Sequence, residues 1–213
     1  MGAIYHELAA DGSSPLCPLA HLDDPGGIGW LFDWFRRLFL RWQIHLDEAQ
    51  TTDLTESLEL AQSQGLRTLT LFASLLQQPR LREVLSNYAG NGKWGHIFDG
   101  EAVLPDRSGR AVTVYEMRGL MALGERAAAP ATELILHGVE SGMGMAPTFI
   151  YVDEAWRMLS DTVSADWLYD AIRTFRKRNA GITLATPALR RLLRSARSGI
   201  LPKAAAITYA GLV

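Results

Sequence analysis

The sequence of 213 residues contains a single cysteine, Cys17, which excludes an internal disulfide framework and is typical of a reducing compartment. The formal net charge is only −2, so the composition offers no overall basic field for nucleic acid or an anionic membrane. Long apolar runs are missing too, because the most apolar early stretch, Ile28 to Ile44, is interrupted by charged side chains. No basic region followed by an apolar one begins the chain. We therefore expect a soluble, cytoplasmic protein whose attachment to a membrane complex is at most peripheral.

The sequence also lacks a phosphate-binding loop of the form Gly-x-x-x-x-Gly-Lys-Ser/Thr. Residues Asn91 to Gly95 share only a Gly-Lys pair with such a loop, and no Ser or Thr follows Lys93. Gly26 to Gly29 precede a predicted helix, but no strand comes before them, as a dinucleotide-binding fingerprint would require. We interpret both segments as turns. The five histidines are scattered without an i, i+4 pair or a cysteine partner, and metal binding through them is not expected.

The most informative feature present is a short apolar run that stops at two carboxylates. Phe149 to Val152 read as a buried parallel strand, and Asp153 and Glu154 follow directly. Acidic groups there lie where open α/β sheets bind ligands. An Asp at this place helps to hold Mg²⁺ in P-loop NTPases, and the adjacent Glu suits the orientation or deprotonation of a water molecule. The alternative is a plain helix amino terminus, where acidic side chains complement the dipole; the preceding strand and following amphipathic helix favour the metal-and-water site.

Two later segments carry polar groups that such a site would use. The helix expected over Ser164 to Arg178 ends in a cationic cluster of Arg173, Arg176, Lys177 and Arg178, and the functional interpretation places one of these arginines across a subunit boundary, where it stabilises a transferring phosphoryl group. Spacing alone favours the simpler interpretation, in which the cluster complements the helix dipole. Ile182 to Ala185 form another short strand, and Thr186 after it either faces a γ-phosphate or caps the next helix.

The apolar periodicity predicts an α/β fold with a helical segment. From about Ile28 to Gly90, apolar residues recur every three or four positions, which indicates an all-helical insertion. The last third alternates helix and strand, which implies parallel βαβ units. We therefore divide the chain into the start of a core (residues 1–26), a helical insertion (27–95) and the remaining core with the strand before Asp153 (96–213).

The individual elements are predicted as follows. Strands are expected over Ala3–Leu8, His96–Phe98, Ala102–Leu104, Ala111–Tyr115, Phe149–Val152, Ile182–Ala185 and Ala204–Tyr209. Beyond the helical insertion, helices are expected over Pro130–Glu140, Ser164–Arg178 and Pro187–Ala196.

Taken in order, these motifs resemble the carboxyl-terminal motor domain of type IV secretion and conjugal-transfer ATPases, particularly the TrbE-like branch. The block Asp153-Glu154-Ala155-Trp156 is the most specific single match, and the similarity extends to about Ala196. The ordered matches are Cys17–Ala20 with Leu22–Asp23, Trp30–Trp34, Arg67–Leu69, Tyr88 with Gly92–Gly95, Phe98–Asp99, Tyr115–Met117, Pro147–Trp156, Arg176–Asn179 and Leu184–Thr186.

The resemblance implies a partial RecA-like P-loop NTPase core, with a mostly parallel sheet and an all-helical insertion. Family members assemble as homo-hexamers at the cytoplasmic face of the inner membrane. They hydrolyse ATP to drive pilus assembly and substrate transfer with other components of the apparatus. Carried over to this chain, Asp153 in a Walker-B-type position serves Mg²⁺ and Glu154 the attacking water. Arg176 and Thr186 are the candidates for contacting phosphate.

Three departures from the family lower the expected activity. The phosphate loop, which lies upstream in the family, is missing, so we expect a fragment that begins after it. The chain has Thr186-Pro187 where the family has Thr-Gln, and the tail after Ala196 follows the family only loosely. Because the loop supplies most phosphate binding, this chain is not expected to hydrolyse ATP on its own.

Three functions remain open at this point. The leading one is the ATP-hydrolysing motor of a conjugal-transfer system, active only with a phosphate loop from elsewhere. The alternative is a non-catalytic assembly or scaffold piece of the same apparatus. The third is a DNA-translocating hexameric ATPase, which the net charge of −2 supports least.

Overall fold

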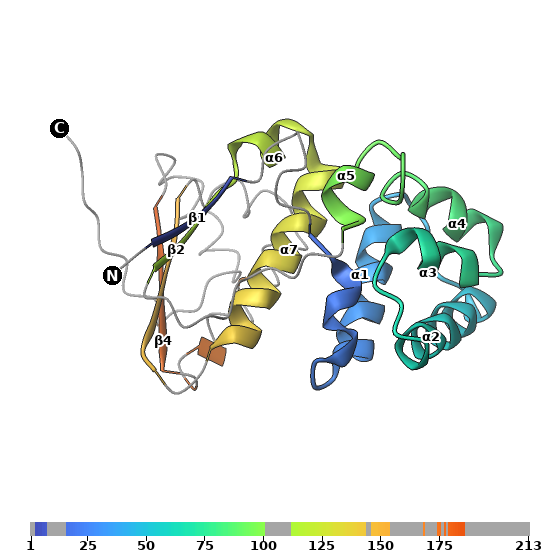
Figure 1. The fold of residues 1–213 in the computed structure, drawn as a ribbon, viewed down its shortest axis with the longest axis horizontal. Coiled ribbons are helices and arrows are strands. Elements are labelled where there is room, and N and C mark those ends of the chain that lie inside the picture. Colours follow the sequence, from blue (N-terminus) through green and yellow to red (C-terminus); the bar gives the residue numbers. More distant parts are fainter. Residues whose placement is uncertain are drawn as a thin grey trace. The chain divides into compact units, whose positions relative to one another are not determined.

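A computed structural model describes residues 3–7, 16–100, 112–143, 146–153, 168, 174, 175, 177 and 179–185. The chain forms two compact units, residues 1–142 and 143–213, and each is described here by itself (Figure 1). The boundaries predicted at residues 27 and 96 stay a prediction.

Helices dominate the first unit. They are a 3-10 helix η1 (Pro18–Asp23), α1 (Gly27–Leu40), α2 (Glu48–Ser63), α3 (Leu69–Leu75), α4 (Pro79–Leu85), α5 (Gly95–Phe98), α6 (Arg118–Ala122) and α7 (Glu125–Gly142). Residues 16–100, all of which are described, contain no strand, so the predicted all-helical segment is confirmed. Local hydrogen bonds determine where some helices begin. At the start of α2 the Asp47 carboxylate accepts from the Gln50 backbone N–H, and the Gln50 side chain accepts from the Asp47 backbone N–H, which forms a capping box.

The core of the first unit is organised around α1. Leu31, Trp34, Phe35 and Leu38 recur at helical spacing and are fully buried. α1 packs against η1, α2 and α7, and Figure 1 shows α7 running beside α1. Aromatic rings join the helices: Phe35 stacks on Phe72 at 4.9 Å between centroids. Burial of this apolar area is the main source of stability for the unit.

Two pairs of parallel strands complete the described structure. In the first unit β1 (Ala3–Glu7) pairs with β2 (Val112–Glu116), and in the second β3 (Thr148–Val152) pairs with β4 (Ala180–Leu184). The parallel pairing predicted for the last third is therefore confirmed for β3 and β4. The predicted burial of β3 was wrong: Phe149 and Tyr151 are 73% and 79% exposed. Their side chains alternate with the half-buried Ile150 and Val152, because successive side chains of a strand point to opposite faces.

The strand predicted over His96 to Phe98 was also wrong, since these residues lie in the short helix α5. A three-residue apolar run does not distinguish strand from helix, and tertiary contacts decided the outcome. The Trp94 carbonyl accepts hydrogen bonds from the N–H groups of Ile97 and Phe98, and both side chains are buried. The Phe98 ring also meets Tyr88 edge-on at 5.3 Å.

Helix α7 begins five residues earlier than predicted, and this places Pro130 inside it. A proline has no N–H to bond the carbonyl four residues before it, which here belongs to Arg126. The Tyr88 hydroxyl donates to that carbonyl at 2.7 Å and so satisfies the group that Pro130 leaves without its helical partner. The sequence pattern placed Pro130 at the helix start, where proline is common, because it contained no sign of this distant donor.

Several predicted elements fall wholly or partly outside the described residues. They are the strands Ala102–Leu104 and Ala204–Tyr209 and the helix Pro187–Ala196. Of the helix predicted over 164–178, Leu168, Thr174 and Phe175 are described as helical, and Leu168 and Phe175 are buried, as expected for its apolar face. Within the described part of the chain, no helix is both long enough and apolar enough to span a bilayer.

Candidate site at the carboxyl edge of a parallel strand pair

Asp153 follows β3 directly and lies at the carboxyl edge of the β3–β4 pair. The register aligns Val152 with Leu184, so the two parallel strands end at the same level. The Ala185 N–H donates to the Val152 carbonyl at 2.8 Å and extends the ladder by one step beyond β4. Backbone pairing thereby fixes the position of the strand end on which Asp153 is carried. This is the edge at which open α/β sheets bind ligands.

The side chain of Asp153 is exposed and presents carboxylate oxygens at this edge. Hard divalent cations such as Mg²⁺ are bound through oxygen, often by one or two carboxylates together with phosphate oxygens of the substrate. The donor chemistry of Asp153 therefore fits Mg²⁺. A Mg²⁺ ion bound there would neutralise phosphate charge.

The other predicted site residues, Glu154, Arg176 and Thr186, lie outside the described residues. Their neighbours in the sequence are described. Glu154 comes next after Asp153, and Thr186 comes next after Ala185, which pairs with β3. Asn179 adopts φ 53°, a left-handed conformation common where helices end, and β4 begins at the following residue. The roles predicted for these residues stay predictions.

The two glycine-rich segments that were interpreted as turns are turns only in part, because Gly27 to Gly29 begin α1 and Gly95 begins α5. Residues 91–94 form turns between α4 and α5, and a Cβ atom on Gly95 would lie 2.0 Å from the Gly90 carbonyl oxygen. Gly26 has φ 75° and immediately precedes α1. Gly95 allows a close approach of two backbone segments, and Gly26 adopts a left-handed conformation. These two backbone requirements explain the glycines without a phosphate ligand.

Several other matched positions have structural contacts that sequence reasoning did not identify. The Asp99 carboxylate accepts from the Thr70 N–H, the Thr70 hydroxyl and the Gly90 N–H, so it holds the start of α3 to the turn after α4. Cys17 is buried, its thiol donates to the Arg67 carbonyl, and burial raises the pKa of the thiol. A raised pKa keeps a thiol protonated and unreactive.

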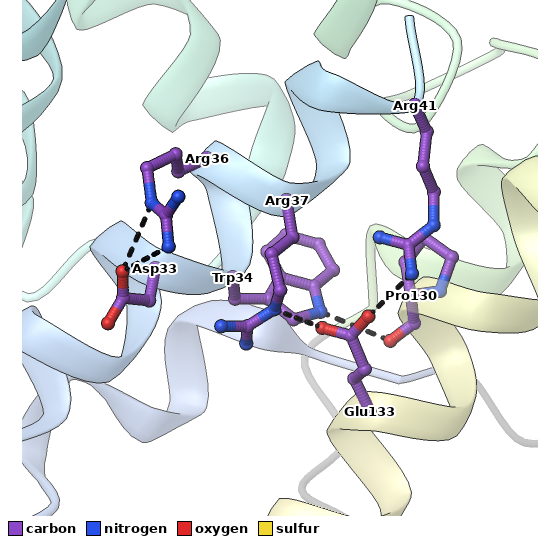
Figure 2. Close-up of polar contacts among 7 residues, drawn as sticks. All are labelled: Asp33, Trp34, Arg36, Arg37, Arg41, Pro130 and Glu133. Atoms are coloured by element: carbon purple, nitrogen blue, oxygen red, sulfur yellow. Dashed lines mark hydrogen bonds and ion pairs between the residues drawn. The ribbon is translucent and has the colours of Figure 1, made fainter. Parts of the chain in front are cut away.

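The polar contacts between α1 and α7 were also missed, because their partners are far apart in the sequence. Figure 2 shows Arg37 and Arg41 of α1 converging on Glu133 of α7, each with a nitrogen–oxygen distance of 2.8 Å. Glu133 is 1% exposed, so this carboxylate is buried and shared by two guanidinium groups. The Trp34 indole N–H donates to the Pro130 carbonyl at 3.1 Å beside them. These contacts fix one helix against the other.

A parallel pair of strands in one unit and a helical segment in the other define the chain as an α/β protein. Comparison with known proteins narrows this class. The chain is 25% identical over 94% of its length to a probable conjugal transfer protein TrbE of Sinorhizobium fredii. It is 29% identical over 87% of its length to the conjugal transfer protein TrbE of Rhizobium radiobacter. No family model matches the chain.

The fold has a counterpart among solved structures. The VirB4 structure from Thermoanaerobacter pseudethanolicus superimposes with a TM-score of 0.71, covering 90% of this chain and 59% of that one at 17% identity. This likeness confirms the predicted fold class, a mixed α/β fold consistent with a partial RecA-like core and a helical region. The chain spans 30% and 22% of the lengths of the two TrbE relatives. The chain is therefore similar in sequence to a segment of the two TrbE conjugal transfer proteins and in fold to part of VirB4.

Proposed function

We propose that this chain is part of an ATP-hydrolysing motor that energises conjugal transfer or type IV secretion. The observation that carries the proposal is the position of Asp153 at the carboxyl edge of a parallel strand pair. Relatives named as conjugal transfer proteins support the biological setting.

In this proposal each candidate residue acts on one part of a Mg²⁺-ATP complex. Asp153 holds Mg²⁺, directly or through its water shell, and Glu154 orients or deprotonates the attacking water. Arg176 stabilises charge on the transferring phosphoryl group, and the Thr186 hydroxyl contacts the γ-phosphate or the water. Preorganised charges of this kind supply most of the catalysis in phosphoryl transfer.

The chain needs a phosphate loop to work in this way. The amide cradle and lysine of such a loop supply most of the phosphate contacts, and the sequence of 213 residues contains no Gly-x-x-x-x-Gly-Lys-Ser/Thr. We therefore propose that hydrolysis requires a segment with this loop, supplied by the same longer polypeptide or by a partner.

The test is to fuse a segment that carries a Gly-x-x-x-x-Gly-Lys-Thr loop upstream of Met1 and to measure phosphate release with Mg²⁺-ATP. The fusion is expected to hydrolyse ATP, whereas the chain alone is not. Glu154→Gln is expected to lower the rate by at least about 100-fold while ATP binding persists, because general-base catalysis contributes roughly 10²- to 10⁴-fold. Asp153→Asn is expected to raise the Mg²⁺ concentration needed for half-maximal rate.

Matched substitutions elsewhere control for nonspecific effects. Glu59→Gln changes an exposed carboxylate of α2, and Asp33→Asn changes an exposed one of α1, so both fusions are expected to keep the parent rate. A folded fusion that binds Mg²⁺-ATP and does not hydrolyse it would refute the catalytic proposal.

A non-catalytic assembly role is the second candidate, favoured by the missing phosphate loop and by Pro187. Calorimetry of the chain alone with Mg²⁺-ATP tests this second candidate, since saturable binding that Asp153→Asn weakens contradicts a pure scaffold. We also propose that the longer protein forms a hexamer and attaches to the inner face of the membrane, beside other components of the apparatus.

A DNA-translocating role predicts salt-dependent DNA binding, which a titration at two salt concentrations tests.

A further inference from the structure

Two histidines and an aspartate from separate parts of the sequence meet in the first unit. His21 lies in η1, Asp24 directly follows that helix, and His137 lies in α7. One ligand atom from each residue (two imidazole nitrogens and a carboxylate oxygen) lies within 4.8 Å of the other two. The scattered histidines of the sequence do not predict this cluster, because only the packing of α7 beside η1 and α1 brings it together.

The distances suit a small divalent cation. The His21 Nδ1 atom lies 2.8 Å from Asp24 Oδ2, and the His137 Nε2 atom lies 3.9 Å from the same oxygen. Ligand atoms bound tetrahedrally at about 2.0–2.1 Å from Zn²⁺ are about 3.3 Å apart. These two separations lie on either side of that value, and the two imidazole nitrogens lie within 4.8 Å of each other.

The surrounding structure holds the ligands in place. The Trp30 ring stacks on the His137 ring at 3.7 Å with 14° between the planes. The start of α1 packs closely on the His21 backbone, since a Cβ atom on residue 27 would lie 1.9 Å from the His21 carbonyl oxygen. His21 is 2% exposed, and the other two side chains are only 14% and 17% exposed. A preorganised and partly desolvated set of ligands binds a cation with less ordering cost than a mobile one.

We propose that His21, Asp24 and His137 bind a zinc-class divalent ion. Two imidazoles and one carboxylate form a ligand set known for Zn²⁺, with a fourth position left for water or another oxygen donor. The Ser141 hydroxyl, 3.4 Å from His137 Nε2, is a described oxygen donor beside the cluster. Imidazole ligands select against Mg²⁺, so this site is chemically different from the one proposed at Asp153. Bound metal joins η1 to α7 and stabilises the first unit.

The test is to titrate the metal-free full chain with Zn²⁺, and separately with Co²⁺, by calorimetry and visible absorption. We expect one saturable site, a Co²⁺ spectrum of a low-coordinate nitrogen–oxygen site, and a metal-dependent rise in Tm. His137→Ala is expected to weaken binding by more than about 100-fold, since losing even an outer-shell partner costs roughly 10- to 100-fold. Asp24→Asn retains a hydrogen-bond acceptor for His21 and removes the charge, so it tests the site if His137→Ala does not fold.

Matched controls change histidines and a carboxylate outside the cluster. His45→Ala and His96→Ala remove exposed imidazoles, and Asp33→Asn changes an exposed carboxylate of α1, so all three are expected to bind Zn²⁺ as the parent does. Absence of saturable Zn²⁺ and Co²⁺ binding by the folded chain overturns the proposal, and the three residues are then a hydrogen-bonded cluster only. Unchanged binding by folded His137→Ala or Asp24→Asn, or a thiolate absorption band from Cys17, also overturns it.

Discussion

The hydroxyl of Tyr88 joins three parts of the first unit. It donates to the Arg126 carbonyl, and it accepts from the Trp42 indole N–H at 3.1 Å. The Arg126 guanidinium in turn lies over the Trp42 ring at 4.1 Å. One residue thus satisfies the backbone group that Pro130 leaves unbonded in α7 and ties that helix to the end of α1. Burial raises the pKa of Tyr88 to about 12 because the phenolate would be desolvated.

This shift predicts a loss of stability at alkaline pH. An unfolded tyrosine ionises near pH 10, whereas Tyr88 in the folded chain stays neutral until about pH 12. The stabilisation is fully present below pH 10 and is lost as the pH rises from there toward 12, by about 2–3 kcal/mol for two pKa units. Denaturant unfolding from pH 8 to 11.5 measures it as the difference between the parent and Tyr88→Phe.

Tyr88→Phe is itself expected to lower the free energy of unfolding by about 1–3 kcal/mol at neutral pH, because the Arg126 carbonyl and the Trp42 N–H lose a shared partner. Tyr151→Phe is the matched control, since that side chain is 79% exposed and should change stability little. A Tyr88→Phe variant with the alkaline stability loss of the parent would contradict the assignment to Tyr88.

At the scale of elements, the contact between α1 and α7 depends on a buried carboxylate shared by two arginines (Figure 2). Removing Glu133 leaves Arg41, whose side chain is 7% exposed, and Arg37 without this partner. Glu133→Ala is therefore expected to lower the free energy of unfolding by about 3–5 kcal/mol, the usual cost of breaking a buried ion pair from one side. Denaturant unfolding at neutral pH measures the change.

A second ion pair on α1 provides a control for the Glu133→Ala substitution. Asp33 and Arg36 also form an ion pair on α1, with both side chains about half exposed. Asp33→Ala is expected to change stability by about 1 kcal/mol or less, because water and salt screen an exposed pair. Equal effects of the two substitutions would show that Glu133 does not hold α1 and α7 together.

At the scale of the whole molecule, the hydrophobic core cluster formed by described residues of the first unit runs from Leu16 to Ile135. This cluster joins η1 and α1–α7, so we expect residues 1–142 to fold without the second unit. Expressed alone, they should show one cooperative thermal transition by near-ultraviolet circular dichroism, and Glu133→Ala should lower its Tm. A non-cooperative transition without fixed aromatic signals would mean that this unit depends on residues 143–213.

Much of the architecture could be predicted from residue patterns. Helical periodicity between Ile28 and Gly90, the strand before Asp153 and the turn chemistry of Gly26 are local features, and local sequence determines them through spacing and backbone preference. The ordered motifs also indicated the family, which the TrbE relatives and the VirB4 fold now support. The position of Asp153 at the strand end followed from the same reasoning, because a strand boundary is visible where an apolar run meets charge.

Only the tertiary structure decided what depends on partners far away in the chain. Ile97 and Phe98 became helical because their burial beside Tyr88 outweighed a weak local preference, and α7 extended past Pro130 because Tyr88 supplied the missing hydrogen bond. The pairing of Glu133 with α1 and the meeting of His21 with His137 arise in the same way. Such contacts depend on how helices pack in three dimensions, and a single sequence holds no local signal for a partner that folding alone brings near.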